Sequence, residues 1–267
     1  MKWREAWMED LPADITYLRT AIANVVLVGD QSSKDWVLVD TGIKGYADKI
    51  LEAAKERFGP APPKAIILTH GHFDHIGSLE GLLESWNVPV YAHERELPFL
   101  TGKDDYPEPD PTVGGGLLSR ISPLFPRSGI DISGRVHALP ADGSIPRMPG
   151  WRWIPTPGHT QGHISLFRES DRALIAGDAF TSVKEESLIA NLTQEEDIHR
   201  PPAYFTTDWD AAWESVKKLE ALKPLYAVTG HGPAMAGQEL QTSLARLARD
   251  FETIAIPEHG RYVHQND

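Results

Sequence analysis

The sequence predicts a mixed α/β fold, and two observations support this prediction. Short apolar runs, which are typical of buried strands, alternate with longer segments that carry apolar residues at helical spacing. Strand-like runs also recur on both sides of a segment rich in Pro, Gly and Asp, about residues 102–134. We therefore expect two comparable halves, each with strands and helices.

The elements of the first half follow from these patterns. Strands are expected at Ile15–Leu18, Val25–Val28, Trp36–Val39, Ala65–Leu68 and Val88–Tyr91. A helix over about Tyr46–Phe58 ends at Gly59-Pro60, which is a strong stop signal. A second helix is expected to begin near His75 and to continue up to Trp86.

The second half repeats this mixture of elements. Strands are expected at Arg135–Leu139, Trp151–Ile154, Ile164–Phe167, Leu174–Ala176 and Leu225–Val228. Helices are expected over about Trp209–Leu222 and Gln238–Ile254, and the polar tail beyond Pro257 is expected to be loose.

The segment between the halves has no regular pattern. Residues 102–134 contain Gly114-Gly115-Gly116 and a small apolar island between Leu117 and Phe125. A long irregular stretch in a compact domain is usually functional or disordered. We predict a lid or substrate-pocket insertion at about 102–134, and a merely structural excursion is the alternative.

One segment concentrates side chains that bind metals. His70, His72, Asp74 and His75 lie directly after the apolar run Ala65–Leu68. In an extended segment alternate residues share a face, so His70 and His72 point the same way. Neutral imidazole and carboxylate are the ligands that zinc and similar divalent metals take. The segment predicts a metal site at a strand end, and a histidine-rich polar loop is the alternative.

Three residues further along the chain match this site. His159, Asp178 and His231 each come at or just after the end of an apolar run, beside glycine. Glycine lets the backbone approach a site closely. The recurrence of such positions favours a metal site over a polar loop.

On these motifs the chain resembles the metallo-β-lactamase fold superfamily of hydrolases. The matching segments, in the family's order, are Val39-Asp40-Thr41-Gly42, the His70–His75 segment, Pro157-Gly158-His159-Thr160, Gly177-Asp178 and Gly230-His231-Gly232. The resemblance covers about residues 15–235 and implies a four-layer αββα sandwich. Because the motifs span the chain, we expect one metallo-hydrolase domain over residues 1–267.

The resemblance also implies two divalent metal ions, with Zn²⁺ expected first and Mn²⁺ or Fe²⁺ as alternatives. One ion would be held by His70, His72 and His159, the second by Asp74, His75 and His231, and Asp178 would bridge the two. A dinuclear pair lowers the pKa of a shared water, so a metal-bridging hydroxide becomes the nucleophile. Asp74 is expected to orient this water and to pass its proton to the leaving group.

Two further residues are expected to support the centre without binding metal. Asp40 would hold the orientation of a ligand, and a turn cap before Gly42 is the alternative. His163 lies four residues past His159, where the family usually has a histidine outside the metal site. We expect His163 to form structural hydrogen bonds.

Single positions separate the branches of the superfamily. True β-lactamases generally carry Cys or Ser at the position of Asp178, and flavin-linked di-iron members have Glu where His72 stands. Acyl-homoserine lactonases place a tyrosine shortly after the bridging aspartate, where this chain has Ala179-Phe180-Thr181. Glyoxalase II-like enzymes add a C-terminal helical region, whereas fewer than about forty residues follow His231.

The composition limits the partners and the compartment. A net charge of −12 argues against nucleic acid, whose binding is dominated by phosphate neutralisation. The absence of cysteine excludes disulfides and cysteine nucleophiles. Residues 1–10 carry acids where a signal peptide needs an apolar stretch, and no run is long enough to span a membrane. We expect a cytoplasmic protein with a small-molecule substrate and no membrane partner, and leave homo-oligomerisation open.

The predicted function is a dinuclear metal-dependent hydrolase, lactonase- or glyoxalase II-like and not a true β-lactamase. It would cleave an ester, lactone or thioester bond in a small molecule. A phosphodiesterase with the same metal core and a binding relative without turnover are the alternatives. Phe180, Tyr204 and Phe205 are candidate pocket walls, since small-molecule sites are lined by aromatic and aliphatic side chains. Core packing is the alternative for each of the three.

Overall fold

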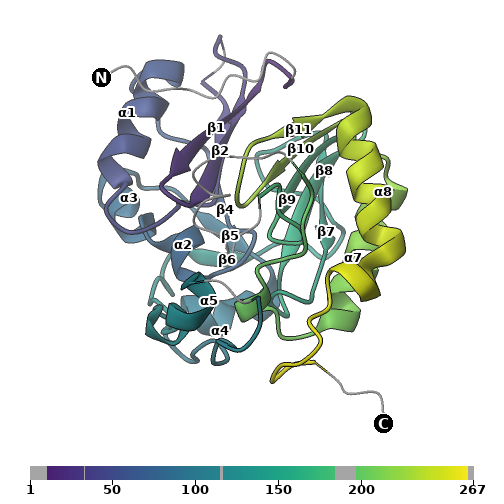
Figure 1. Cartoon of the computed structure of the whole chain (residues 1–267). Helices are drawn as coiled ribbons and strands as arrows, with labels where there is room; N and C mark the ends of the chain where they lie inside the picture. Colours follow the sequence, from purple (N-terminus) through teal and green to yellow (C-terminus); the bar gives the residue numbers. More distant parts are fainter. Residues whose placement is uncertain (1–10, 33, 115–116, 184–196, 264–267) are drawn as a thin grey trace.

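Two β-sheets pack face to face, and helices cover the outer face of each (Figure 1). The structure is a computed structural model that describes residues 11–32, 34–114, 117–183 and 197–263. The layers run helix, sheet, sheet, helix. The prediction of a four-layer αββα sandwich is confirmed.

The first sheet is built by the first half of the chain. Its strands lie side by side in sequence order: β1 (Ile15–Thr20), β2 (Ala23–Gly29), β3 (Trp36–Val39), β4 (Ile66–Ile67), β5 (Val90–Ala92) and β6 (Val136–Ala138). The first three strands are antiparallel and the last four are parallel, with β3 belonging to both groups. Helices α1 (Ala47–Phe58) and α3 (Leu79–Ser85) connect parallel strands and cover the outer face.

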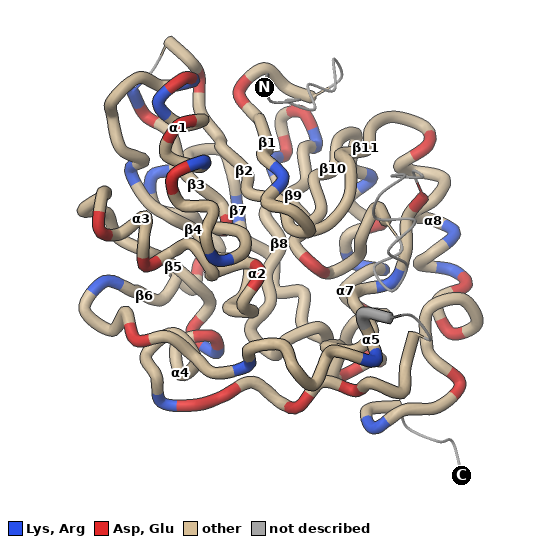
Figure 2. The backbone as a smooth tube through the Cα atoms, turned by 60° about the vertical axis from the view of Figure 1, so that its left-hand side comes forward, with Lys and Arg blue, Asp and Glu red and all other residues tan. Residues whose placement is uncertain are grey.

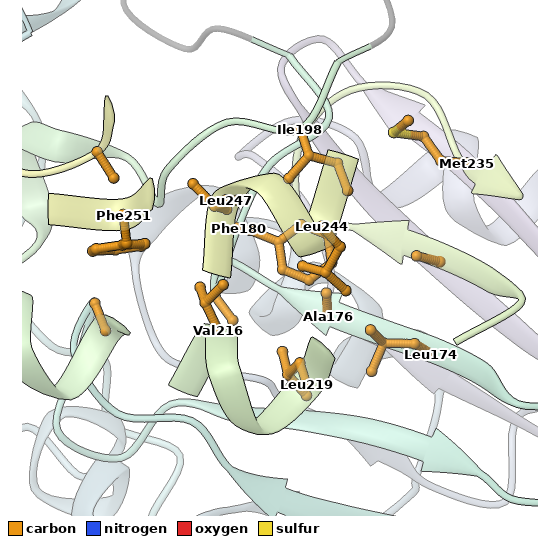
Figure 3. Close-up of a cluster of buried hydrophobic side chains, with 14 of the residues drawn as sticks. Leu174, Ala176, Phe180, Ile198, Val216, Leu219, Met235, Leu244, Leu247 and Phe251 are labelled. Atoms are coloured by element: carbon orange, nitrogen blue, oxygen red, sulfur yellow. The ribbon is translucent and has the colours of Figure 1, made fainter. Parts of the chain in front are cut away.

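The second sheet has the order β11-β10-β9-β8-β7. Its strands are β7 (Trp151–Pro155), β8 (Ile164–Arg168), β9 (Ala173–Gly177), β10 (Tyr226–Thr229) and β11 (Met235–Ala236). Only β9 and β10 pair in parallel among these described strands. Helices α7 (Trp209–Ala221) and α8 (Gly237–Ile254) cover the outer face, with Val216, Leu244 and Leu247 packed against the sheet (Figure 3).

Strand β2 shows how the sequence divides the cores. Its side chains alternate between the two faces of the sheet, as in any strand. Val25 and Leu27 pack under the helices, whereas Val26 and Val28 pack between the sheets. Since both faces are covered, the strand is apolar along nearly its whole length, which is why it reads as a continuous run.

The helix expected from His75 to Trp86 is wrong as a single element. The chain forms α2 (Phe73–Ile76) and then α3, with Gly77 and Ser78 between them. A Cβ at Gly77 would lie 2.3 Å from the backbone N of Lys44, so the turn approaches a neighbouring loop closely. Ser78 fixes the break, because its hydroxyl donates to the carbonyl of Ile43 at 2.6 Å.

The insertion at 102–134 follows η1 (Glu94–Glu96) and α4 (Leu97–Leu100) and contains α5 (Leu117–Ile121) and η2 (Ser122–Leu124). Residues 115–116 of its glycine run lie outside the described residues. The C-terminal tail packs against it: the Arg261 guanidinium lies 2.9 Å from Glu108 Oε2, and the Tyr262 hydroxyl donates to the Glu108 carbonyl. The prediction of a loose tail is therefore wrong as far as residue 263.

Candidate metal centre

The predicted ligands come from strand ends in both sheets. His70 to His75 follow β4 and lead into α2, whereas His159 follows β7, Asp178 follows β9 and His231 follows β10. The sandwich brings all of these side chains to one buried centre. Three overlapping groups have ligand atoms within 4.8 Å of one another: His70, His72 and His159; His70, His75 and Asp178; and Asp74, His75 and His231.

Three imidazole nitrogens of the first group converge on one point. His70 Nε2 lies 3.1 Å from His72 Nδ1, which lies 2.9 Å from His159 Nε2. Burial, reinforced by neighbouring imidazoles, lowers the pKa of His70 and His72 well below the usual value and that of His159 to about 3. The rings are neutral at physiological pH, which is the form that binds metal.

Asp178 lies between the two expected ligand sets, which are His70, His72 and His159 on one side and Asp74, His75 and His231 on the other. Its Oδ2 lies 3.4 Å from His159 Nε2 and 3.1 Å from His231 Nε2, and its Oδ1 lies 3.4 Å from His75 Nε2. The other acid, Asp74, lies 3.5 Å from His231 through Oδ2. This geometry is the one expected for a carboxylate that lies between two metal positions.

The buried acids differ in their electrostatics. Burial raises the pKa of Asp74. Burial would also raise the pKa of Asp178, but the facing imidazoles of His231 and His75 bring it well below the usual value. Asp178 is therefore ionised, and its charge faces the centre of the cluster.

Two orphaned polar atoms show that the centre fits a cation. His75 Nε2 and Asp178 Oδ1 are buried and form no hydrogen bond with the described residues, although the two atoms lie 3.4 Å apart as an ion pair. Buried polar atoms in native proteins are nearly always paired, so an orphan calls for a ligand. Burial would lower the pKa of His75, but the carboxylates of Asp178 and Asp40 outweigh it and raise that pKa well above its usual value, so a bound cation would take the place of a proton on His75. Imidazoles and carboxylates together are ligands that suit divalent metal ions such as zinc.

Asp40 orients the ligand segment through both carboxylate oxygens. Its Oδ2 accepts from His75 Nδ1 at 2.9 Å and from the Thr69 hydroxyl at 2.7 Å, and its Oδ1 accepts from the Thr69 N–H at 2.8 Å. Since Nδ1 of His75 is occupied by Asp40, the free nitrogen Nε2 points into the centre. Asp40 thus lies where it can hold the orientation of the candidate ligand His75, which is the role expected from the sequence.

His163 holds the loop of Asp178. Its Nε2 accepts from the Asp178 N–H at 2.8 Å, and its Nδ1 lies 3.1 Å from the carbonyl of Thr156. Burial lowers the pKa of His163 to about 4, so the ring is neutral, with a proton on Nδ1 for Thr156. Both nitrogens are used in the structural hydrogen bonds that were expected.

Gly230 must be glycine for the centre to close. A Cβ at this position would lie 1.9 Å from Asp178 Oδ1 and 2.8 Å from His75 Cε1. The absence of a side chain lets the loop before His231 pass directly beside the candidate ligands.

All three predicted pocket residues are buried in one core cluster, with Phe180 0%, Tyr204 4% and Phe205 6% exposed. Tyr204 and Phe205 lie in η3 (Ala203–Phe205), and the Phe205 ring is 4.7 Å from the ring of His72. Phe180 instead is fully buried in the core between the second sheet and its helices (Figure 3). It has no surface to offer a substrate, so the structure gives Phe180 the packing role.

Sequence reasoning missed several residues that contact the centre. Phe73, between two candidate ligands, lies 5.4 Å from the ring of Phe125 in the insertion. Glu96 accepts hydrogen bonds from the loops of His72 and His159. Phe73 could have been noticed from its position in the motif, but a glutamate flanked by Arg95 and Leu97 carries no signal of burial.

A metal centre of this kind in an αββα sandwich defines a class of hydrolase. The family model described as the metallo-β-lactamase superfamily matches residues 18–231. The chain belongs to this superfamily and is a metal-dependent hydrolase.

Relatives and solved structures agree with this assignment. The chain is 50% identical to the probable metallo-hydrolase YflN of Bacillus subtilis, over 89% of this chain and 90% of the relative. It is 31% identical to YybB, a probable metallo-hydrolase of the same organism, over 74% and 76% of the two chains. The structure is similar to that of TTHA1623 in a di-iron-bound form, with 25% identity, a TM-score of 0.55 and coverage of 88% and 96%.

None of the helices in the described part of the chain combines the length and the apolar character needed to cross a bilayer.

Proposed function

We propose that the protein hydrolyses an ester, lactone or thioester bond in a small molecule, using two divalent ions. His70, His72 and His159 would hold one ion, Asp74, His75 and His231 the other, and Asp178 would contact both. The observation that carries this proposal is the buried carboxylate of Asp178, which lies between the histidines of the two sets. True β-lactamases generally have Cys or Ser at this position, which favours the lactonase, thioesterase and phosphodiesterase branches.

Bound ions of this kind would activate water and polarise the carbonyl group whose carbon the water attacks. The chain's own residues would supply orientation and proton transfer. Asp178 keeps its negative charge toward the centre, and Asp40 and His163 fix His75 and Asp178 by hydrogen bonds. Asp74, whose pKa is raised by burial, is suited to accept a proton and pass it to the leaving group.

Aromatic side chains beside the centre favour an apolar acyl group. Phe205 contacts His72, and the ring of Phe125 lies 5.4 Å from Phe73 and 6.2 Å from Phe205. Phe73 and Phe125 are only partly buried, so part of this surface is accessible. Small-molecule sites are typically lined in this way, which supports the insertion at 102–134 as part of a substrate pocket.

Zn²⁺ is the ion that we propose, because nitrogen and carboxylate ligands without sulfur suit it well. Fe²⁺ and Mn²⁺ are the competitors, since the same donors bind them. The di-iron-bound form of TTHA1623 makes iron the first ion to compare with zinc.

A phosphodiesterase activity is the second candidate, because the same centre would suit a phosphoryl group. Figure 2 shows basic and acidic residues interspersed along the described chain, within a net charge of −12. This distribution does not favour polyanionic partners, so we propose a small-molecule substrate and no nucleic acid.

Initial rates on a matched panel would test the proposal. Zn²⁺-, Fe²⁺- and Mn²⁺-loaded protein would be given a lactone, an acyl thioester, a β-lactam and an aryl phosphodiester, with Asp178→Ala as the background. We expect a carbonyl substrate other than the β-lactam to be hydrolysed fastest, by orders of magnitude. A faster phosphodiester would establish the second candidate instead.

A further inference from the structure

A fully buried glutamate lies against the first set of candidate ligands. Glu96, the last residue of η1, has no exposed surface. No Lys, Arg or His in the described part of the chain forms an ion pair with it. Burying a carboxylate is costly unless hydrogen bonds compensate it, and four donors do so here: the N–H groups of Gly71 and Gly162 and the hydroxyls of Tyr106 and Thr160.

Three of these donors, Gly71, Thr160 and Gly162, belong to the two loops that carry His70, His72 and His159. Gly71 separates His70 from His72, and its N–H lies 3.0 Å from Glu96 Oε2. Thr160 directly follows His159, and its hydroxyl donates to Oε1 at 2.7 Å. One carboxylate thus joins a loop of the first half of the chain to a loop of the second half, at the residues that flank the three histidines.

Tyr106 extends the same connection. Its ring lies 4.5 Å from the ring of His72 and stacks on Phe99 at 3.9 Å. Its hydroxyl donates to Glu96 and accepts from the Gly71 N–H at 2.9 Å. Through this residue the insertion also supports the histidine that lies beside Phe205.

Two glycines make room for the pair. A Cβ at Gly71 would lie 2.6 Å from the Tyr106 hydroxyl, and a Cβ at Gly162 would lie 2.6 Å from Glu96 Oε1. Each ligand loop therefore lacks a side chain at the point where the pair approaches it. An unrelated buried acid would not require a glycine in both of these ligand loops.

We propose that Glu96 is a positioning residue that sets the geometry of His70, His72 and His159 for one metal ion, with Tyr106 as its partner. Glutamine at position 96 would keep the volume but replace one acceptor oxygen by an NH₂ group that faces donors. The two ligand loops would then lose part of the hydrogen bonding that joins them through residue 96. Partners that orient metal ligands from outside typically contribute about 10- to 100-fold to metal affinity.

The test measures Co²⁺ affinity by the visible absorption of the bound ion, in two backgrounds that each keep one set. In His231→Ala only the first set is complete, and in His159→Ala only the second. We expect Glu96→Gln to weaken Co²⁺ binding by about 10- to 100-fold in the first background, with a changed absorption spectrum, and by less than about twofold in the second. Equal losses in both backgrounds, or none in the first, would overturn the proposal.

Tyr106→Phe is a milder variant that keeps the ring against His72 and Phe99 and removes only the hydroxyl. It should weaken Co²⁺ binding in the first background alone, by several-fold. Asp110→Asn is the matched control, because Asp110 is a buried acid that accepts hydrogen bonds from Thr112 and from the N–H of Arg261, neither of which is a candidate ligand. If this control shifts Co²⁺ binding as much as Glu96→Gln does, the effect is general destabilisation and the proposal is wrong. No substrate is used, so failure here would leave the proposed hydrolysis untouched.

Discussion

The two halves of the molecule build the metal centre in different ways. The first half supplies four candidate ligands on one short segment after β4, whereas the second half supplies three from separate loops after β7, β9 and β10. His231 and Asp178 alone are separated by 53 residues. The four candidate ligands of the first half are arranged by local geometry, whereas the three of the second half come together only when the second sheet has formed. Asp178 and Glu96 are the residues at which the two arrangements meet.

Asp178→Asn should have the largest effect, because it removes the charge that faces both sets. We expect the rate of hydrolysis to fall by more than about 100-fold, which is the upper end of what loss of a ligand-orienting residue costs. Both ions should be lost. Metal content by mass spectrometry, measured beside the rate, checks this. Retention of two tightly bound ions would mean that Asp178 does not join the halves.

Gly230→Ala should come next, since the new Cβ would meet Asp178 Oδ1 and His75. We expect the second set to lose its ion and activity to fall by roughly 10- to 100-fold, comparable to the loss of a ligand-orienting contact. Gly134→Ala is the matched control, because a Cβ there has no neighbour within 4 Å. Similar metal binding in the two variants would contradict the close approach of the second-half loop.

Asp40→Asn tests the first half alone. Asn tolerates the left-handed backbone that Asp40 adopts at φ 60°, so the loop itself should persist. The amide cannot accept from Thr69 and His75 as the carboxylate does, and metal affinity should fall by about 10-fold. Isothermal titration of the metal-free variant with Zn²⁺ measures this, and an unchanged affinity would remove Asp40 from the support of His75.

The comparison also shows what the sequence can predict. The motif after β4 could be interpreted directly, because its residues are neighbours in the chain. His159, Asp178 and His231 were recognised because glycines and strand ends mark them. Glu96 and Tyr106 could not be found, since their burial depends on glycines in two distant loops. For the same reason the break at Gly77 was missed: it is required by contact with Lys44, not by local propensity.

Phe125→Ala addresses the insertion rather than the ligands. Loss of its ring removes contacts to Phe73 and Phe205 while all candidate ligands remain. We expect KM to rise several-fold for an apolar acyl substrate and kcat to change little. An unchanged KM across acyl chain lengths would argue against a pocket wall at this position.

The smallest effect concerns the contact between the insertion and the C-terminal tail. Burial would raise the pKa of Asp110, but hydrogen bonds from Thr112 and Arg261 outweigh it and lower that pKa. The ionised form therefore stabilises the fold above the unfolded value of about 3.9, and this contribution is lost as the pH falls through the lower folded pKa. Asp110→Asn should lower the melting temperature slightly at pH 7, with the difference from the parent shrinking below about pH 4. A difference that grows with acid would contradict the role of the carboxylate.

The most direct measurement is the number of Zn²⁺ ions that one chain binds at equilibrium after chelator treatment, for the parent protein and for Asp178→Ala. Two ions for the parent and no tightly bound pair for the variant are expected if both halves form one dinuclear centre. One ion per parent chain, or an unchanged pair in the variant, would contradict it.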